Sequence, residues 1–273
     1  MNPEFRNSFV ALLAVCLAAI VGGCASPPPI TSAAPTRPPD TLPPVKQTET
    51  SPRDRAAVHV ELGAGYYERG QMDIALEELN EAAALDPINP RVYNIYGLVY
   101  ALLGDNAKAE QNFQRALALA PQDSDIRHNW GWYLCSNERP REAIPEFELA
   151  LRNPLYRTPE IALVNAGRCS VAIGDLAGAE SYFKRAQART PNNAAAAYGL
   201  ALLAYRAGRL EEARGWTRRL TQQAAPTPEV LYLGMCVERK AGDRGAEGSY
   251  IFQLRNRYPD SAEAKSAVSG ACE

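Results

Sequence analysis

The sequence predicts an all-α solenoid of about six helical hairpins followed by a C-terminal capping helix. Small residues recur with a period of 34, glycine stands where most of the first helices have to end, and proline follows each second helix. Three series of residues have this spacing: Gly63, Gly97 and Gly131; Ala75, Ala109 and Ala143; and Leu79, Phe113 and Phe147. A single hairpin cannot bury its apolar face, so we expect stability to come from stacking neighbouring units.

The units differ in regularity along the chain. The third closes one residue early at Pro154, and a two-residue insertion precedes the fourth. The fifth has Thr217 at the aromatic position, and the sixth has one extra residue before Gly242 and regains the register at Ile251. In order, the units are predicted near residues 56–89, 90–123, 124–159, 160–193, 194–226 and 227–260, with the cap at 261–273.

A 34-residue hairpin period with small residues at the helix crossing resembles the tetratricopeptide repeat (TPR), from about residue 56 onward. This resemblance implies a binding scaffold whose first helices line a concave groove. The mixed aromatic, amide and aliphatic lining suits an extended or helical peptide, although part of it can instead pack internally. The residues predicted to form this partner-binding groove are Val60, Tyr67, Asn94, Leu98, His128 and Trp132.

The first 23 residues have the layout of a secretory signal peptide. A 13-residue apolar run from Phe9 to Val21 is too short for a membrane span and ends just before Cys24. The small residues preceding Cys24 resemble the bacterial lipobox, which implies removal of residues 1–23 and lipidation of this cysteine. Ala25 resembles the residue found after the cysteine in lipoproteins sorted to the outer membrane. The alternative is a plain signal peptide with an accidental cysteine.

Residues 24–54 are predicted to form a disordered tether. Nine prolines fall between residues 25 and 54, together with serine, threonine and few large apolar groups. Such a segment cannot bury enough surface to fold. At ~3.1 Å per residue its greatest reach is about 90 Å, so the repeats at 55–273 could stand clear of a membrane surface.

Composition argues against several functional classes. The formal net charge is −2, from 29 basic and 31 acidic residues, so nucleic acid is not an expected partner. His59 and His128 are the only histidines, and neither has a cysteine or carboxylate nearby at metal-ligand spacing. With no strand before a glycine-rich loop and no acid–base constellation, we expect no enzyme, no cofactor, no metal and no small-molecule substrate.

Four cysteines remain beyond Cys24, and sequence alone allows three pairings. Cys135 and Cys169 both fall late in the first helices of adjacent hairpins, and Cys236 and Cys272 fall at matching heights on the last hairpin and the cap. The register therefore favours Cys135–Cys169 and Cys236–Cys272. Four reduced thiols are the alternative, less suited to an oxidising compartment.

A closer resemblance rests on the lipobox, the tether, the six repeats and two segments, residues 129–135 (Asn-Trp-Gly-Trp-Tyr-Leu-Cys) and 153–156 (Asn-Pro-Leu-Tyr). Together they are similar to the PilF/PilW lipoproteins of type IV pilus biogenesis, some of which share the cysteine pair 135/169. The resemblance implies a non-enzymatic pilotin, anchored at the periplasmic face of the outer membrane, that binds the secretin subunit and promotes its localisation and multimerisation. The alternative is a TPR adaptor lipoprotein of another envelope machine, such as the Tad pilus, outer-membrane protein assembly or peptidoglycan enzymes.

Overall fold

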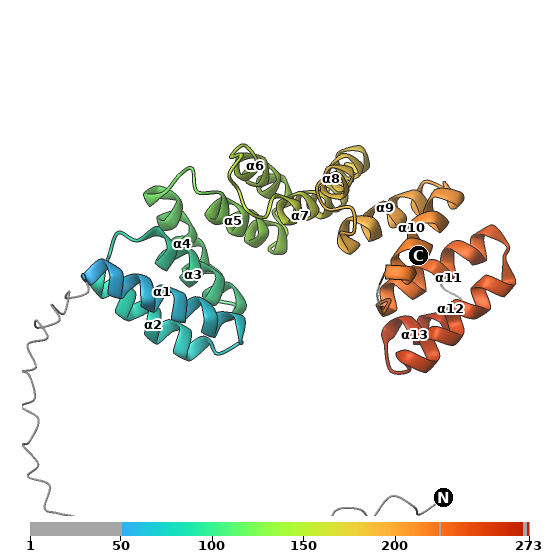
Figure 1. Cartoon of the computed structure of the whole chain (residues 1–273), viewed down its shortest axis with the longest axis horizontal. Coiled ribbons are helices and arrows are strands. Elements are labelled where there is room, and N and C mark those ends of the chain that lie inside the picture. The colour runs from blue at the N-terminus through green and yellow to red at the C-terminus, as the bar shows by residue number, and fades with distance from the viewer. Residues whose placement is uncertain (1–50, 224, 270–271, 273) are drawn as a thin grey trace, which may run out of the picture. The chain divides into compact units, whose positions relative to one another are not determined.

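The computed structural model describes residues 51–223, 225–269 and 272, which form helices and no strand (Figure 1). The helices belong to one compact unit, Glu49–Glu273. In chain order they are α1 (Pro52–Glu68), α2 (Met72–Leu85), α3 (Pro90–Leu102), α4 (Asn106–Leu119), α5 (Ser124–Ser136), α6 (Pro140–Leu151), α7 (Pro159–Ala172), α8 (Leu176–Arg189), α9 (Ala194–Arg206), α10 (Leu210–Gln223), α11 (Pro228–Ala241), α12 (Arg244–Arg257) and α13 (Ala262–Ser269).

The helices pair as six antiparallel hairpins that stack in chain order. Each second helix packs against its own first helix and then against the first helix of the next hairpin, as α2 does with α1 and α3 (Figure 1). Helix α13 packs against α11 and α12 and buries Ala264 and Ala267 there. The predicted all-α TPR solenoid with a capping helix is confirmed.

The hairpin crossings explain why the period is strict. A Cβ added to Gly97 would lie 2.8 Å from the ring of Phe113, and one added to Gly167 would lie 2.7 Å from the ring of Phe183. The alanines of the same register, such as Ala109, are completely buried. Small residues are therefore required on one helix so that the aromatic side chain of the other can fill the crossing.

The turn inside each hairpin also repeats. Gly70, Gly104, Gly174, Gly208 and Gly242 all adopt a left-handed backbone conformation with φ between 73° and 82°. Glycine reaches this region without a steric penalty. The third hairpin is the exception, because Glu138 takes the equivalent place with φ 60°.

The folded region begins earlier than the sequence predicts. The tether is predicted to run to residue 54, but α1 already starts at Pro52. Ser51 and Asp54 form a reciprocal capping box, in which Ser51 Oγ accepts from Asp54 N at 3.1 Å and the Asp54 carboxylate accepts from Ser51 N. This cap and proline at the first turn start the helix ahead of the apolar repeat pattern.

The last two hairpins replace apolar contacts with polar ones. Thr217 is fully buried at the position that Phe113 occupies in the second hairpin, and its hydroxyl donates to Arg214 O at 3.2 Å. Glu247, with only 6% of its surface exposed, takes the place of the alanine at the crossing. Its carboxylate accepts from Arg239 Nε at 2.6 Å and from Arg244 at 2.9 Å. These pairs make a buried carboxylate tolerable there.

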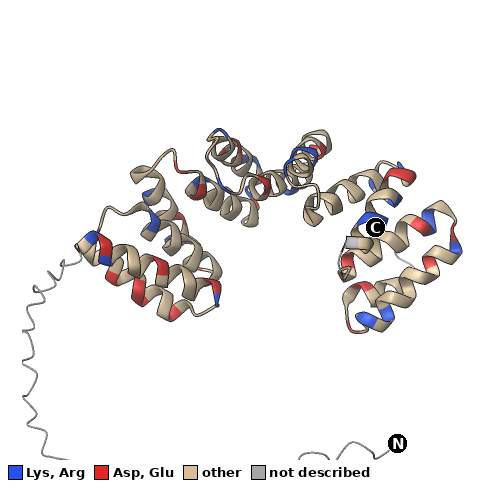
Figure 2. Cartoon of the chain, viewed as in Figure 1, with Lys and Arg blue, Asp and Glu red and all other residues tan. Residues whose placement is uncertain are grey.

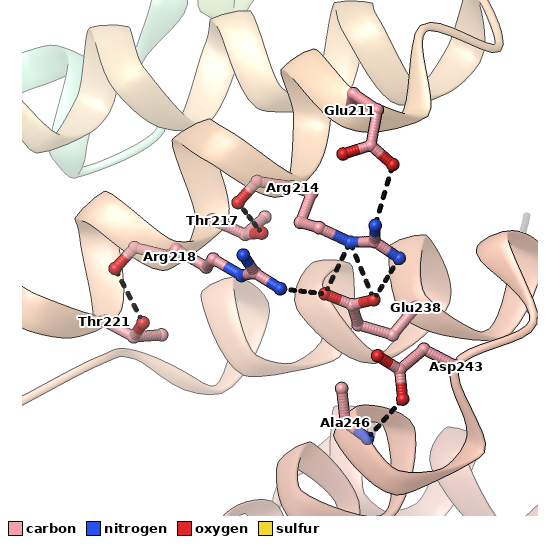
Figure 3. Close-up of polar contacts among 8 residues, drawn as sticks. All are labelled: Glu211, Arg214, Thr217, Arg218, Thr221, Glu238, Asp243 and Ala246. Atoms are coloured by element: carbon pink, nitrogen blue, oxygen red, sulfur yellow. Dashed lines mark hydrogen bonds and ion pairs between the residues drawn. The ribbon is translucent and has the colours of Figure 1, made fainter.

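A second buried carboxylate joins α10 to α11 (Figure 3). Glu238 is 1% exposed and accepts hydrogen bonds from Arg214 Nε at 2.9 Å and Arg214 Nη2 at 2.7 Å. Arg218 lies 4.0 Å from the same carboxylate, and Glu211 pairs with the far side of Arg214 at 2.7 Å. Removing one partner of such a buried ion pair leaves the other charge unpaired and destabilises the fold more than replacing both partners with apolar residues would.

Candidate protein-binding face

The contacts between hairpins define an inner face. Consecutive first helices contact one another directly, as α3 does with α5 and α5 with α7. Consecutive second helices do not contact one another among the described residues. The first helices therefore lie closer together than the second helices do. We call the surface that α1, α3, α5, α7, α9 and α11 turn away from the second helices the inner face (Figure 1).

The structure buries one of the two groove residues predicted on the first hairpin, and leaves the other partly exposed. Val60 is only 1% exposed and belongs to the core with Ala75 and Leu79, so predicting it as a groove residue was wrong. Its position on α1 is turned toward α2 and α3. Tyr67 is half-buried, and burial, followed by the nearby Glu68, raises the pKa of its hydroxyl.

Charge is distributed unevenly along the stack. Residues 51–86 contain eight acidic and three basic side chains, and Figure 2 shows the acidic ones along α1 and α2. This excess of negative charge surrounds the hairpin that carries Tyr67. A basic partner segment would be favoured here over an acidic one.

The second and third hairpins bring amide groups together between α3 and α5. Asn94 on α3 is 8% exposed, and its Oδ1 accepts a hydrogen bond from Asn129 Nδ2 on α5 at 3.1 Å. Leu98, one turn further along α3, is half-buried and packs against the core cluster that contains Trp130. Asn94 is therefore a buried residue of the contact between α3 and α5, and its role in the groove stays a prediction.

His128 lies at the centre of a polar cluster between α5, α7 and the loop that joins α6 to α7. Asn165 Nδ2 donates to His128 Nε2 at 3.0 Å, so the proton of the neutral ring is on Nδ1 and is donated to Tyr156 Oη at 2.6 Å. Burial lowers the pKa of His128 to about 4. Burial also raises the pKa of Tyr156 to about 12. Both rings are thus neutral hydrogen-bonding groups at physiological pH.

Trp132 is shared between the core and the surface. It is half-buried and packs against the cluster formed by Phe113, Trp130 and Phe147. Its exposed part is therefore held in one orientation by its neighbours. A fixed, partly exposed indole is a common anchor in protein interfaces.

The cysteines are brought together in the pairs that the register favours. Cys135 and Cys169 are bonded with their Cα atoms 6.0 Å apart, and Cys236 and Cys272 with theirs 5.6 Å apart. The first pair links α5 to α7, and the second links α11 to the chain beyond α13. Each disulfide therefore links neighbouring units of the stack. The first joins two first helices, and the second joins a first helix to the chain that follows the cap.

Three known sets of proteins resemble this chain. One tetratricopeptide-repeat model matches residues 60–124 and 128–194, and a second such model matches residues 171–233. The type IV pilus assembly protein PilF of Pseudomonas aeruginosa is 26% identical over 212 residues, which are 77% of this chain and 84% of PilF. The crystal structure of PilW, a widely conserved type IV pilus biogenesis factor, is similar with a TM-score of 0.73 at 30% identity, covering 78% of this chain and 98% of PilW. The chain belongs to the PilF/PilW family of type IV pilus biogenesis TPR proteins.

The likeness extends over nearly the whole of a second solved structure as well. A structure of Pseudomonas aeruginosa PilF gives a TM-score of 0.74 at 24% identity and is covered to 99%, with 81% of this chain. Repeats of this kind act in protein–protein interaction, so a partner protein is the expected ligand of this PilF/PilW-family member. The signal peptide, Cys24 and most of the tether lie outside the described residues and stay predictions.

Two further findings concern this member of the PilF/PilW family. No helix in residues 51–223 or 225–269 is long and apolar enough to cross a membrane. In the same part of the chain, no group of three or more histidine, cysteine, aspartate or glutamate residues is placed to hold a metal ion.

The sequence analysis missed three polar side chains beside the predicted groove residues. Asn129, Tyr156 and Asn165 all bond to residues that were predicted for the groove. Asn129 directly follows the predicted groove residue His128, and Asn165 stands at the same place in the next unit. A repeated asparagine at this position on α5 and α7 was the signal that could have revealed them.

Proposed function

We propose that this protein is a non-enzymatic pilotin: a lipoprotein of the outer membrane that binds the secretin subunit of the type IV pilus and promotes its localisation and multimerisation. Membership of the PilF/PilW family, with 98% of PilW covered at 30% identity, is the observation that carries this proposal. The inner face supports it, because it offers aromatic and amide groups fixed on a rigid stack of helices.

Anchoring through Cys24 gives the first test. Cys24→Ser should leave the protein without acyl chains, and the repeat region should move from the outer-membrane fraction to the soluble or inner-membrane fraction. The measurement is fractionation of the cell envelope followed by immunoblotting. Unchanged outer-membrane fractionation of the Cys24→Ser protein would contradict the lipid anchor.

Partner identity gives the second test. When this TPR protein is purified from detergent-solubilised membranes, the secretin should co-purify with it. Deletion of the gene for the TPR protein should reduce the amount of detergent-resistant secretin multimer. Recovery of a different envelope machine without any secretin would support the adaptor alternative. If the secretin co-purifies but deletion of the gene does not change secretin multimerisation, the protein binds the secretin without acting as a pilotin.

The binding face gives the third test. Because interface energy concentrates in aromatic anchors, Tyr67→Ala and Trp132→Ala should each weaken secretin binding by about 2 kcal/mol or more. Both side chains also contact core clusters, so binding is to be compared well below the melting temperature of each variant. Trp216→Ala on α10 is the matched control, because Trp216 is equally half-buried but belongs to a second helix. Equal binding by all three variants would exclude the inner face.

A further inference from the structure

The first hairpin lacks a neighbour that every later hairpin has. Each of α3, α5, α7, α9 and α11 packs against the second helix of the hairpin before it, whereas α1 contacts only α2 and α3 among the described helices. At the other end of the stack, α13 covers the last hairpin. A stack of helical repeats needs a polar or covered surface at each end, because its end units otherwise expose the surface through which repeats stack.

The stacking surface of α1 is apolar and exposed. Val58 is 56% exposed, whereas the residues at its register position on α3, α5, α7 and α9 are at most 1% exposed: Val92, Ile126, Ala162 and Ala196. Leu62, one turn later, is 42% exposed, and its five equivalents are at most 8% exposed: Tyr96, Trp130, Ala166, Leu200 and Leu233. The exposure of Val58 and Leu62 therefore comes from the missing neighbour and not from their place in the repeat.

Two more residues extend this apolar stripe along α1. Residues three or four apart lie on one face of a helix, so Gly65 and Tyr66 follow Val58 and Leu62 on the same face. Tyr66 is half-buried, and a Cβ added at Gly65 would meet no neighbouring atom within 4 Å. Packing inside the described chain therefore does not require glycine at this position. Glycine in the middle of a helix is destabilising relative to alanine, and the close approach of another backbone is a common reason for it.

The stripe is complementary to a second copy of itself. When two α1 helices pack antiparallel about a two-fold axis at Leu62, the Val58 of each copy lies opposite the Tyr66 of the other. A smaller side chain then faces a ring, as at the hairpin crossings, and Gly65 beside the axis lets the two backbones approach closely. A two-fold contact of this kind uses the same patch on both copies and closes at two subunits.

The charges at the two ends of α1 suit the same antiparallel arrangement. The start of the helix carries Arg53, Asp54 and Arg55, and its end carries Glu68 and Arg69, all of them exposed. None of the five has an ion pair in the described part of the chain. Antiparallel packing brings the start of one helix to the end of the other, where Glu68 meets the two arginines and Arg69 meets Asp54. In a parallel pair the two starts, each with a net positive charge, would face one another.

We propose that α1 is a self-association site, at which two copies of this chain pack antiparallel through Val58, Leu62 and Tyr66. The inference goes beyond the proposed function, because it does not depend on which protein the inner face binds. A contact between single helices is small, so the association is reversible and increases where copies are concentrated, as copies anchored in one membrane would be. A dimer presents two inner faces, which suits a partner that repeats its binding segment.

The first test is sedimentation equilibrium of the chain from residue 25 onward, made without acylation, from low to high micromolar concentration. We expect a reversible monomer–dimer equilibrium. Leu62→Glu should weaken the association at least tenfold and leave the melting temperature of dilute protein unchanged, because this side chain is exposed in the monomer. Leu176→Glu on α8 is the matched control and should associate as the wild type does, since Leu176 is 45% exposed but its hairpin has neighbours on both sides.

Introduced cysteines test the arrangement of the two copies in the full chain, inside cells. Leu62→Cys should form a disulfide between two copies, because the two-fold axis places this position opposite itself. Val58→Cys and Tyr66→Cys should cross-link when they are co-expressed, and each alone should cross-link at least fivefold less. Leu176→Cys is the control that should stay monomeric on a non-reducing gel.

Several outcomes would overturn the self-association site. They are a monomer at every concentration, association unchanged by Leu62→Glu, association that continues beyond the dimer, or Val58→Cys cross-linking to itself as well as to Tyr66→Cys. Cross-linking of Leu62→Cys to a different protein, and not to a second copy, would assign the surface to another partner and also overturn the proposal. Loss of secretin binding with self-association intact would count against the proposed function alone.

Discussion

Truncation of Phe113 should be among the most damaging single changes in the repeat region. Its side chain is completely buried at the crossing of α3 and α4, with ring centroids 5.7 Å from Trp130 and 5.4 Å from Tyr133. Gly97 leaves no room for a Cβ beside the ring, so the site is filled from all sides. Phenylalanine-to-alanine changes in such cores cost about 3–5 kcal/mol, from lost burial and from the cavity left behind. The aromatic contacts on two sides place Phe113→Ala in the upper part of this range.

The assay for Phe113→Ala is equilibrium unfolding in urea, followed by circular dichroism and by tryptophan fluorescence. Fluorescence reports the mutated crossing directly, because Trp130 lies against the ring. Thr217→Ala, at the same position of the fifth hairpin, is the control and should cost only about 1–2 kcal/mol, for a methyl group and one hydroxyl hydrogen bond. A loss of less than about 1.5 kcal/mol for Phe113→Ala, or one equal to that of Thr217→Ala, would refute the argument that this crossing is rigidly filled.

Three other outcomes follow from the structure. In urea unfolding, Gly97→Ala should destabilise by about 1–3 kcal/mol, whereas Gly65→Ala, whose Cβ meets nothing within 4 Å, should stabilise by about 0.5–1 kcal/mol. Burial lowers the pKa of His128 in the folded protein to about 4, so as pH falls below 6.5 the unfolded chain binds a proton at this histidine before the folded protein does. Between pH 6.5 and about 4, the wild type should therefore lose on the order of 3 kcal/mol more stability than His128→Gln. Non-reducing peptide mapping of periplasmic protein should link Cys236 to Cys272, and free thiols at both would contradict that pairing.

The fold could be predicted from the sequence at positions where only one size of residue fits the packing. At the hairpin crossings a glycine or alanine faces a large side chain, so the period could be read directly, as at Gly97 and Phe113. The same register aligned Cys135 with Cys169, because equal heights on adjacent first helices bring Cα atoms close together. Steric requirements of this kind are local and repeat unit by unit.

Side-chain partners on the inner face could not be predicted in the same way. Whether Asn129 points toward Asn94 depends on the rotation of α5 against α3, which the repeat pattern does not specify. Val60 has the phase of a groove residue, yet the packing of α2 and α3 around α1 buries it. The start of α1 was missed for a different reason, since it depends on the hydrogen bonds of Ser51 and not on apolar periodicity.

Repetition and selectivity place opposite demands on this chain. Stacking requires the same small and aromatic residues at every crossing, and residues that are the same in each unit cannot select a partner. Selectivity has to come from positions that differ between hairpins, and the register position that is Val60 on α1 carries an amide at Asn94 on α3 and an imidazole at His128 on α5. The insertion before α7 carries Tyr156 to His128 within this same stretch. The largest departure from the period therefore helps to fix the part of the inner face that is most distinctive of this chain.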